Sequence, residues 1–126
     1  MEEFQALKAG KRHKYVIFNL NRDNTEVIVE KVSGSTDYDD FIKDLPEAEC
    51  RWAVYDFEFE KAGVGKRTIT FVSWAPDPAK IKQKVLFASC KDALRRALVG
   101  VALEVQGTEY SEVAYASVLD KANRGN

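Results

Sequence analysis

The run Tyr15–Leu20 constrains the fold more than any other part of the chain. Asn19 is its one clearly polar residue, and six residues make a strand rather than a helix. An alternating strand has one face in solvent, whereas a nearly continuous apolar run has to be covered on both faces. We therefore expect this run to be a central strand of a sheet.

The remaining strand patterns surround this central run. Turn-forming residues at 21–24 predict a hairpin back onto it, and a glycine-containing loop at 61–66 predicts a second hairpin. Further strands are expected at 26–32, 51–58, 68–74 and 101–105.

Helical patterns lie between these strands. Asp37 is placed to cap one helix and Gly10 to end another. In the longest helix, Ser89 and Cys90 are weak helix formers, and a bend is expected there. Hairpins combined with helices predict an α/β (α+β) fold, a mixed sheet with helices on both faces, in a single domain over 1–126. The expected helices are 2–9, 38–45, 79–99 and 113–122, and the core stripe expected for the third is Ile81, Val85, Leu86, Ala93, Leu94, Ala97 and Leu98.

Charge and cysteine content bound the class of protein. Lys and Arg total 19 against 20 Asp and Glu, which argues against a bulk-basic nucleic-acid binder. The two cysteines, Cys50 and Cys90, lie 40 positions apart, so a disulfide framework or zinc site is not expected and a reducing compartment is. The first residues are charged and no apolar stretch is long enough to span a bilayer. We expect a cytoplasmic protein.

No pattern indicates catalysis. His13 is the single histidine; it lies in a basic turn, where we expect it to be exposed. The run 63–68 resembles a phosphate loop, but Arg67 occupies the position of the required Ser or Thr. The acidic residues within 37–49 are expected to form a solvated helix face. We expect no enzyme, no cofactor and no metal.

A cluster of cations on the longest helix is more informative. Only Asp92 opposes them, and it is spaced to pair with Arg96 one turn later. A solvated helix face would explain the cluster, but so would binding to an acidic protein surface, to anionic lipid headgroups or to a nucleic-acid backbone. Nucleic acid is the weakest alternative, because no exposed aromatic residues interleave with the cations. The cations are Lys80, Lys82, Lys84, Lys91, Arg95 and Arg96.

The same helix carries a recognisable signature. Residues 88–98 (ASCKDALRRAL) closely resemble the long-helix motif of the actin-depolymerising factor/cofilin family. Other family motifs follow the same order, so the resemblance covers the chain from Phe4 to its C-terminal end, with loop lengths closer to fungal than to vertebrate members. These motifs are 45–47 (LPE), 50–59 (CRWAVYDFEF), 65–67 (GKR), 74–77 (WAPD) and 105–108 (VQGT).

The resemblance implies a fold and a function. Members have a mixed sheet of five or six strands flanked by helices, and no enzymatic activity. They bind actin monomers and filament sides, prefer the ADP state, and change filament twist so that filaments sever and depolymerise. Phosphoinositide headgroups compete with actin for the same cations. A monomer in the cytoplasm, on the actin cytoskeleton, is therefore expected, with nuclear entry left open.

The resemblance also assigns residues to two surfaces. Lys91, Arg95 and Arg96 match the long-helix surface used for both monomer and filament, and Asp92 matches a supporting, helix-ordering position in it. The positions that match the second, filament-specific surface are Lys82, Lys84, Asp120, Lys121 and Arg124.

One departure bears on activity. Family members usually begin with a flexible segment of about a dozen residues that contacts actin and often holds a phosphorylatable serine, whereas the first serine here is Ser33. We expect no phosphoregulation ahead of the first helix, and filament-side binding that depends less on such a segment than severing does. Two alternatives stay open: a non-severing relative, resembling glia maturation factor or coactosin, and a peripheral phosphoinositide-binding module.

Overall fold

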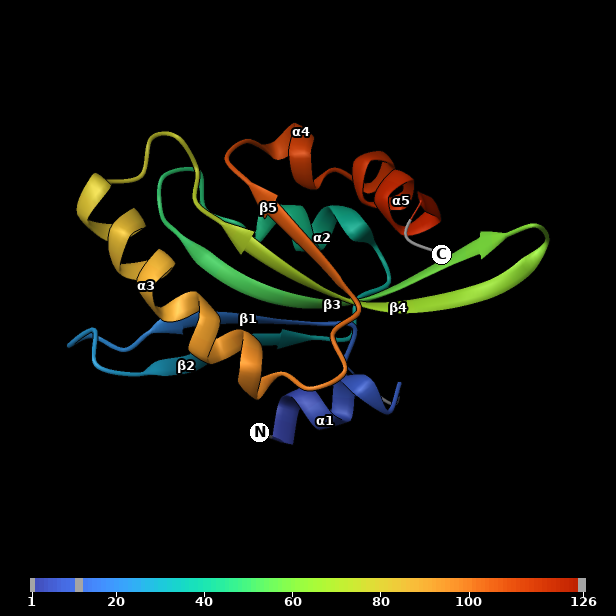
Figure 1. Cartoon of the computed structure of the whole chain (residues 1–126), viewed down its shortest axis with the longest axis horizontal. Helices are drawn as coiled ribbons and strands as arrows, with labels where there is room; N and C mark the ends of the chain where they lie inside the picture. Colours follow the sequence, from blue (N-terminus) through green and yellow to red (C-terminus); the bar gives the residue numbers. More distant parts are fainter. Residues whose placement is uncertain (1, 11–12, 125–126) are drawn as a thin grey trace.

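Five strands form one sheet in the computed structural model, which describes residues 2–10 and 13–124. In space their order is 2-1-3-4-5 (Figure 1). All neighbours are antiparallel except the fourth and fifth strands, which are parallel, so the sheet is mixed as predicted. The strands are β1 (Tyr15–Leu20), β2 (Val27–Ser33), β3 (Arg51–Lys61), β4 (Val64–Trp74) and β5 (Leu103–Gly107).

Helices cover both faces of this sheet (Figure 1). One core contains α1 (Glu2–Lys8) and α3 (Ile81–Ala97), whose Phe4, Phe87 and Leu94 are buried with residues of β1 and β3. The other core lies beneath the remaining helices. Because β1 and β3 lie between the two cores, their side chains are buried on both faces, which confirms the central position predicted for 15–20. The remaining helices are α2 (Tyr38–Lys43), α4 (Tyr110–Val113) and α5 (Tyr115–Arg124).

Turn and cap chemistry places several element ends where the sequence predicts them. The Asp37 side chain accepts a hydrogen bond from the backbone N–H of Asp39 and so caps α2. Gly10 follows α1 with a φ of 71°, in the left-handed region that glycine adopts without a steric penalty. In α3 the Ser89 hydroxyl donates a hydrogen bond to the Leu86 carbonyl. This bond to the preceding turn is the interaction on which the prediction of a bend was based.

Several element boundaries differ from prediction. The second hairpin turns on only Ala62 and Gly63, both at positive φ, so its strands extend into the range 61–66 that was predicted to be a loop. The helix predicted at 113–122 is α5 and lies two residues later, and the short helix α4 before it was not predicted; Ala114, in an extended conformation, separates the two. The last strand lies two residues later than predicted.

The core stripe of α3 was only partly predicted. Phe87, Leu94 and Leu98 are buried, whereas Ile81 and Val85 lie in solvent. Both sets have helical spacing, so apolar character alone did not show which one faces the sheet. Phe87 decides the orientation, because its ring stacks on Trp52 with centroids 4.1 Å apart.

His13 is half-buried rather than exposed. It lies one residue before Lys14, whose backbone hydrogen bonds link it to β2 and β3. Its predicted neighbours in the basic turn, Lys11 and Arg12, lie outside the described residues.

Candidate functional site

The outward face of α3 combines apolar and charged side chains. Ile81, Val85, Ala88, Asp92 and Arg96 recur every three or four residues, so they share one face of the helix. Ile81 is 78% exposed and Val85 62% exposed. Two large aliphatic side chains exposed one turn apart make this helix face a candidate for contact with another macromolecule. The sequence-based interpretation did not predict this exposed surface, because it assigned both residues to the core.

Cations flank this face in different environments. Arg95 is half-buried and its Nε donates to Glu104 Oε1 at 2.8 Å, so part of its charge is neutralised by β5. Lys84 Nζ donates to the Asp77 carbonyl at 3.0 Å. Among the described residues, Lys91 and Arg96 form no hydrogen bond or ion pair through their side chains. The side chains of Lys80 and Lys82 likewise form no such bond to the described residues and are exposed, so these four cations are all open to an anionic partner.

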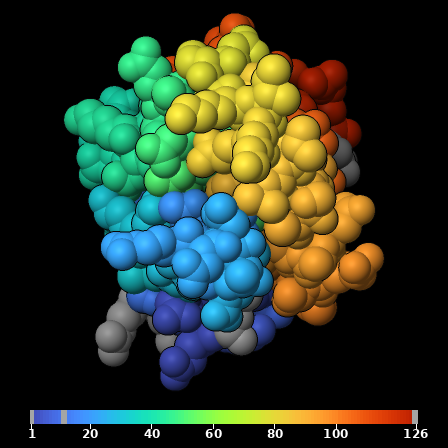
Figure 2. Space-filling view, turned by 90° about the vertical axis from the view of Figure 1, so that its left-hand side faces the viewer, coloured from blue at the N-terminus to red at the C-terminus, as the bar shows by residue number. Residues whose placement is uncertain are grey.

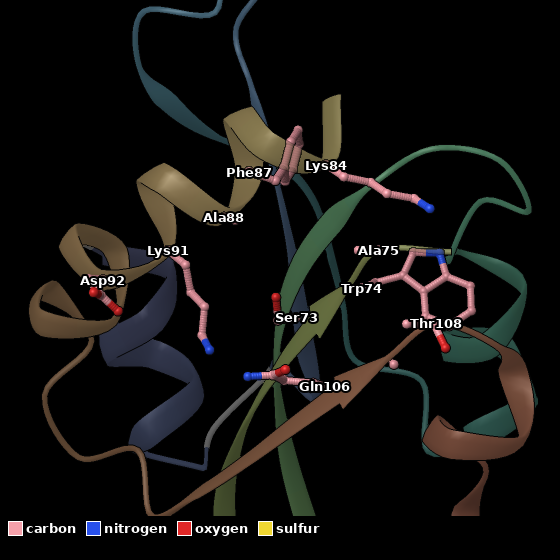
Figure 3. Close-up of a pocket in the computed structure, with 11 residues that line it drawn as sticks. Ser73, Trp74, Ala75, Lys84, Phe87, Ala88, Lys91, Asp92, Gln106 and Thr108 are labelled. Atoms are coloured by element: carbon pink, nitrogen blue, oxygen red, sulfur yellow. The ribbon is translucent and has the colours of Figure 1, made fainter. Parts of the chain in front are cut away.

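A cleft lies between α3 and the C-terminal ends of β4 and β5 (Figure 3). Its volume is about 350 Å³, and residues of both strands form its floor. Figure 3 shows Lys91 reaching from the helix toward Gln106, while Lys84 extends along the side that carries Trp74. Two ammonium groups therefore border a concave site of a size suited to an anionic side chain.

Asp92 does not pair as the sequence predicted. In the described part of the chain, no ion pair joins its carboxylate to Arg96. An i,i+4 ion pair does form on α5, where Arg124 Nη2 is 2.9 Å from Asp120 Oδ2. Asp92 lines the cleft instead, together with Lys91.

The residues assigned to a filament-specific surface do not come together. Lys82 and Lys84 lie on α3, whereas Asp120, Lys121 and Arg124 lie on α5, which packs against the opposite face of the sheet. They are therefore two separate patches. Lys82 adjoins the Lys91 surface through the shared helix.

Lys82 also borders a second hollow of about 510 Å³. There the start of α3, the β1–β2 turn and the loop before β3 meet at one surface of the molecule (Figure 2). Lys80, Lys82 and Glu49 are among its lining residues. The cationic surface of α3 thus continues to the N-terminal end of the helix.

Titration properties give no indication of catalytic chemistry. Burial raises the pKa of the Cys50 thiol, which keeps it protonated and unreactive. Burial also raises the pKa of Tyr15 and of Tyr55 to about 12.

No group of three or more His, Cys, Asp or Glu in the described ranges is arranged to hold a metal ion. None of the described helices is both long and apolar enough to cross a membrane.

Comparison with known proteins agrees with this arrangement. Residues 1–123 match the family model described as "Cofilin/tropomyosin-type actin-binding protein". The cofilin of Mycosarcoma maydis is 58% identical over 98% of this chain and 90% of its own length. The cofilin of Saccharomyces cerevisiae is 50% identical over 97% of this chain and 87% of its own. The similarity to fungal members expected from loop lengths is therefore confirmed.

Solved structures show the same fold. The crystal structure of Streptomyces griseoflavus cofilin superposes with a TM-score of 0.95 at 62% identity, covering 99% of this chain and 93% of the other. Coactosin from Entamoeba histolytica, at 13% identity and a TM-score of 0.85 over 98% of this chain and 90% of its own, shares the fold alone. On this evidence the chain belongs to the cofilin/actin-depolymerising factor family.

Proposed function

We propose that this protein binds actin monomers and filament sides, prefers ADP-actin, and severs and depolymerises filaments, with 1–126 acting as one domain. The observation that carries the proposal is the outward face of α3, where exposed Ile81 and Val85 adjoin unpaired cations. The family assignment supplies the partner.

The apolar half of this face supplies affinity. Fully burying a valine or isoleucine side chain is worth about 1.5–3 kcal/mol, so Ile81 and Val85 together are worth several. Both are fixed on a helix whose other face is packed against the sheet. Little conformational entropy is therefore lost on binding.

The cations set orientation and rate. Contacts with both the monomer and the filament are made by Lys91, Arg95 and Arg96. The Asp92 carboxylate lowers the positive potential at the cleft. Lys82 and Lys84 extend this surface along the filament. Exposed charges of this kind act mainly on the association rate and its salt dependence.

The α5 patch is a second filament contact. Asp120 and Arg124 are paired and largely exposed, and Lys121 lies between them on the same helix. Because this patch and α3 lie on opposite faces of the sheet, one molecule would engage two different actin subunits through them. Binding two subunits at once couples the protein to their relative rotation, which is how preferential binding to a twisted filament shifts the filament toward that state.

Co-sedimentation with ADP-actin filaments tests the proposal. We expect the protein to pellet with filaments while actin in the supernatant rises. Co-pelleting without that rise would assign the chain to a non-severing relative, and no co-pelleting would reject actin binding. Arg96→Ala is expected to weaken binding about fivefold to tenfold. Lys43→Ala, which removes an exposed cation from α2, is the matched control and should pellet like the wild type.

The same cations would attract anionic lipid. We propose that phosphoinositide vesicles compete with actin for α3, and that the protein acts as a cytoplasmic monomer on the cytoskeleton. Vesicles containing phosphoinositide should release the protein from filaments, and Arg96→Ala should reduce that release. Lipid binding that leaves filament binding unchanged would instead favour a separate peripheral membrane module, and nuclear entry is a question for imaging.

A further inference from the structure

A groove distinct from the two hollows beside α3 lies on the opposite face of the sheet. It runs between α2 on one side and α4 with the start of α5 on the other, and its volume is about 330 Å³. Its lining residues include three tyrosines and one carboxylate: Tyr38, Asp39, Ile42, Tyr110, Ala114 and Tyr115. A volume at the low end of the range for binding sites fits one or two side chains rather than a large ligand.

The tyrosine walls of this groove are held in place. The Tyr38 hydroxyl donates to the Val113 carbonyl at 2.6 Å, which links α2 to α4. The Tyr110 hydroxyl donates to the Leu45 carbonyl at 2.7 Å, across the same gap. The ring of Tyr115 lies edge-on to that of Tyr38 with centroids 5.5 Å apart. A site built this way is formed before a ligand arrives, so binding costs little ordering entropy.

Two of these rings are open to solvent. Tyr110 is 38% exposed and Tyr115 46% exposed, although both also contact other aromatic rings. Rigid, partly exposed tyrosines are typical of the points where protein interfaces concentrate their binding energy. Their ring faces attract cations through the quadrupole of the ring.

The charge around the groove favours the same kind of ligand. Within the described residues the Asp39 carboxylate accepts no hydrogen bond and forms no ion pair, even with Lys43 one turn later. Burial raises the pKa of the Tyr110 hydroxyl, and the nearby Glu47 carboxylate raises it further. The helices and loops around the groove carry eight acidic residues and only three cations, although Asp44 and Asp120 are already paired with Lys31 and Arg124. The acidic residues are Asp37, Asp39, Asp40, Asp44, Glu47, Glu109, Glu112 and Asp120, and the cations are Lys43, Lys121 and Arg124.

We propose that this groove binds an arginine side chain presented by an extended segment of a partner protein. The planar guanidinium stacks on the Tyr110 and Tyr115 rings while its N–H groups donate to the Asp39 carboxylate. Arginine suits this site better than lysine, because its charge is planar, more weakly hydrated and matched in shape to a carboxylate. Since the groove and α3 lie on opposite faces, such a partner would bind while α3 is occupied.

Backbone amide chemical shifts measured by NMR test the proposal directly. The probe is the blocked peptide Ac-Gly-Pro-Arg-Pro-Gly-NH2, titrated to about 10 mM, the range in which one side chain binds measurably. The matched probe replaces arginine with citrulline, which keeps the shape and removes the charge. We expect saturable shifts at the amides of Asp39, Ile42, Ser111 and Tyr115 with the arginine peptide, and binding at least fivefold weaker with the citrulline peptide.

Variants separate the groove from general effects. Asp39→Asn removes the charge but keeps the backbone N–H that donates to the Asp37 side chain. It should weaken binding of the arginine peptide about fivefold and leave filament co-sedimentation unchanged. Tyr115→Leu should weaken it similarly. Asp23→Asn, at an exposed carboxylate in the β1–β2 turn, should have no effect.

Several results would overturn the proposal. Equal affinity for the two peptides would show an apolar groove without charge recognition, and shifts confined to other surfaces would show non-specific attraction. Shifts at the groove that follow protein concentration without peptide would assign it to a second copy of the chain. None of these readouts requires actin, so failure here is distinguishable from failure of the proposed function.

Discussion

Arg67 is bound to Asp56 at the centre of the sheet and to α1 at the same time. Its Nε donates to Asp56 Oδ1 at 2.6 Å, and its Nη2 donates to the carbonyls of Leu7 and Lys8. The Asp56 side chain is almost fully buried, whereas Arg67 is about one third exposed. One guanidinium thus neutralises a buried carboxylate and satisfies the open C-terminal carbonyls of a helix.

Replacing Arg67 should therefore destabilise the protein strongly. Arg67→Ala leaves Asp56 buried without its partner, and we expect a loss of about 2–4 kcal/mol in the free energy of unfolding. Urea denaturation measures it, with Lys66→Ala, an exposed neighbour on the same strand, as the control. A loss below about 1 kcal/mol would show that water replaces the guanidinium at Asp56.

Val85→Ser tests the apolar half of α3. The side chain is 62% exposed, so we expect the unfolding free energy to change by less than about 0.5 kcal/mol. Filament affinity in co-sedimentation should fall about tenfold or more, because a buried contact is lost at the interface. Val32→Ser removes an exposed valine from β2 and should pellet like the wild type. Equal loss in both variants would point to general surface hydrophobicity.

Gly107 has no room for a side chain. A Cβ added there would lie 2.6 Å from Val113 Cγ1 and 3.1 Å from Trp74 Cε3. Gly107→Ala should therefore lower stability by about 1–3 kcal/mol, through overpacking where β5 meets α4. Thermal unfolding measures this, and Gly65→Ala is matched to it because a Cβ at Gly65 meets nothing within 4 Å. A thermal midpoint that is the same for both variants would contradict the packing argument.

The raised pKa of Tyr15 predicts that the protein loses folding stability at alkaline pH. Burial, and then a 2.5 Å hydrogen bond to Asp44 Oδ2, raise its pKa from 10.0 to about 12. A hydroxyl with a raised pKa contributes stability that is complete below pH 10 and is lost as the pH rises toward 12. Tyr15→Phe removes this hydroxyl, so it should cost about 1 kcal/mol at neutral pH, a deficit that shrinks above pH 10. A deficit independent of pH between 9 and 11 would contradict this assignment.

Much of the fold was predictable because its strongest patterns are local. The apolar run of β1, the Asp37 cap and Gly10 each act within a few residues, and all lie where the sequence places them. The break at Ala114 was not predicted, because alanine is a strong helix former and the residues on both sides of it are helical.

The proposed binding surface on α3 was predicted less completely. The α3 cations could be identified from their charge and from the family motif, whereas the exposure of Ile81 and Val85 depends on how the helix rotates against the sheet. That rotation is set by Phe87 stacking on Trp52, a contact between residues 35 positions apart. No local pattern contains it.

The separation of charge by the sheet has a consequence for how the protein meets its partner. Its net charge is only −1, yet cations gather on α3 and carboxylates around α2 and α4, so the molecule is a permanent electric dipole. We expect the resulting torque to turn α3 toward an anionic partner surface before contact, so that more collisions become productive. This alignment acts over about one Debye length, roughly 8 Å at physiological salt.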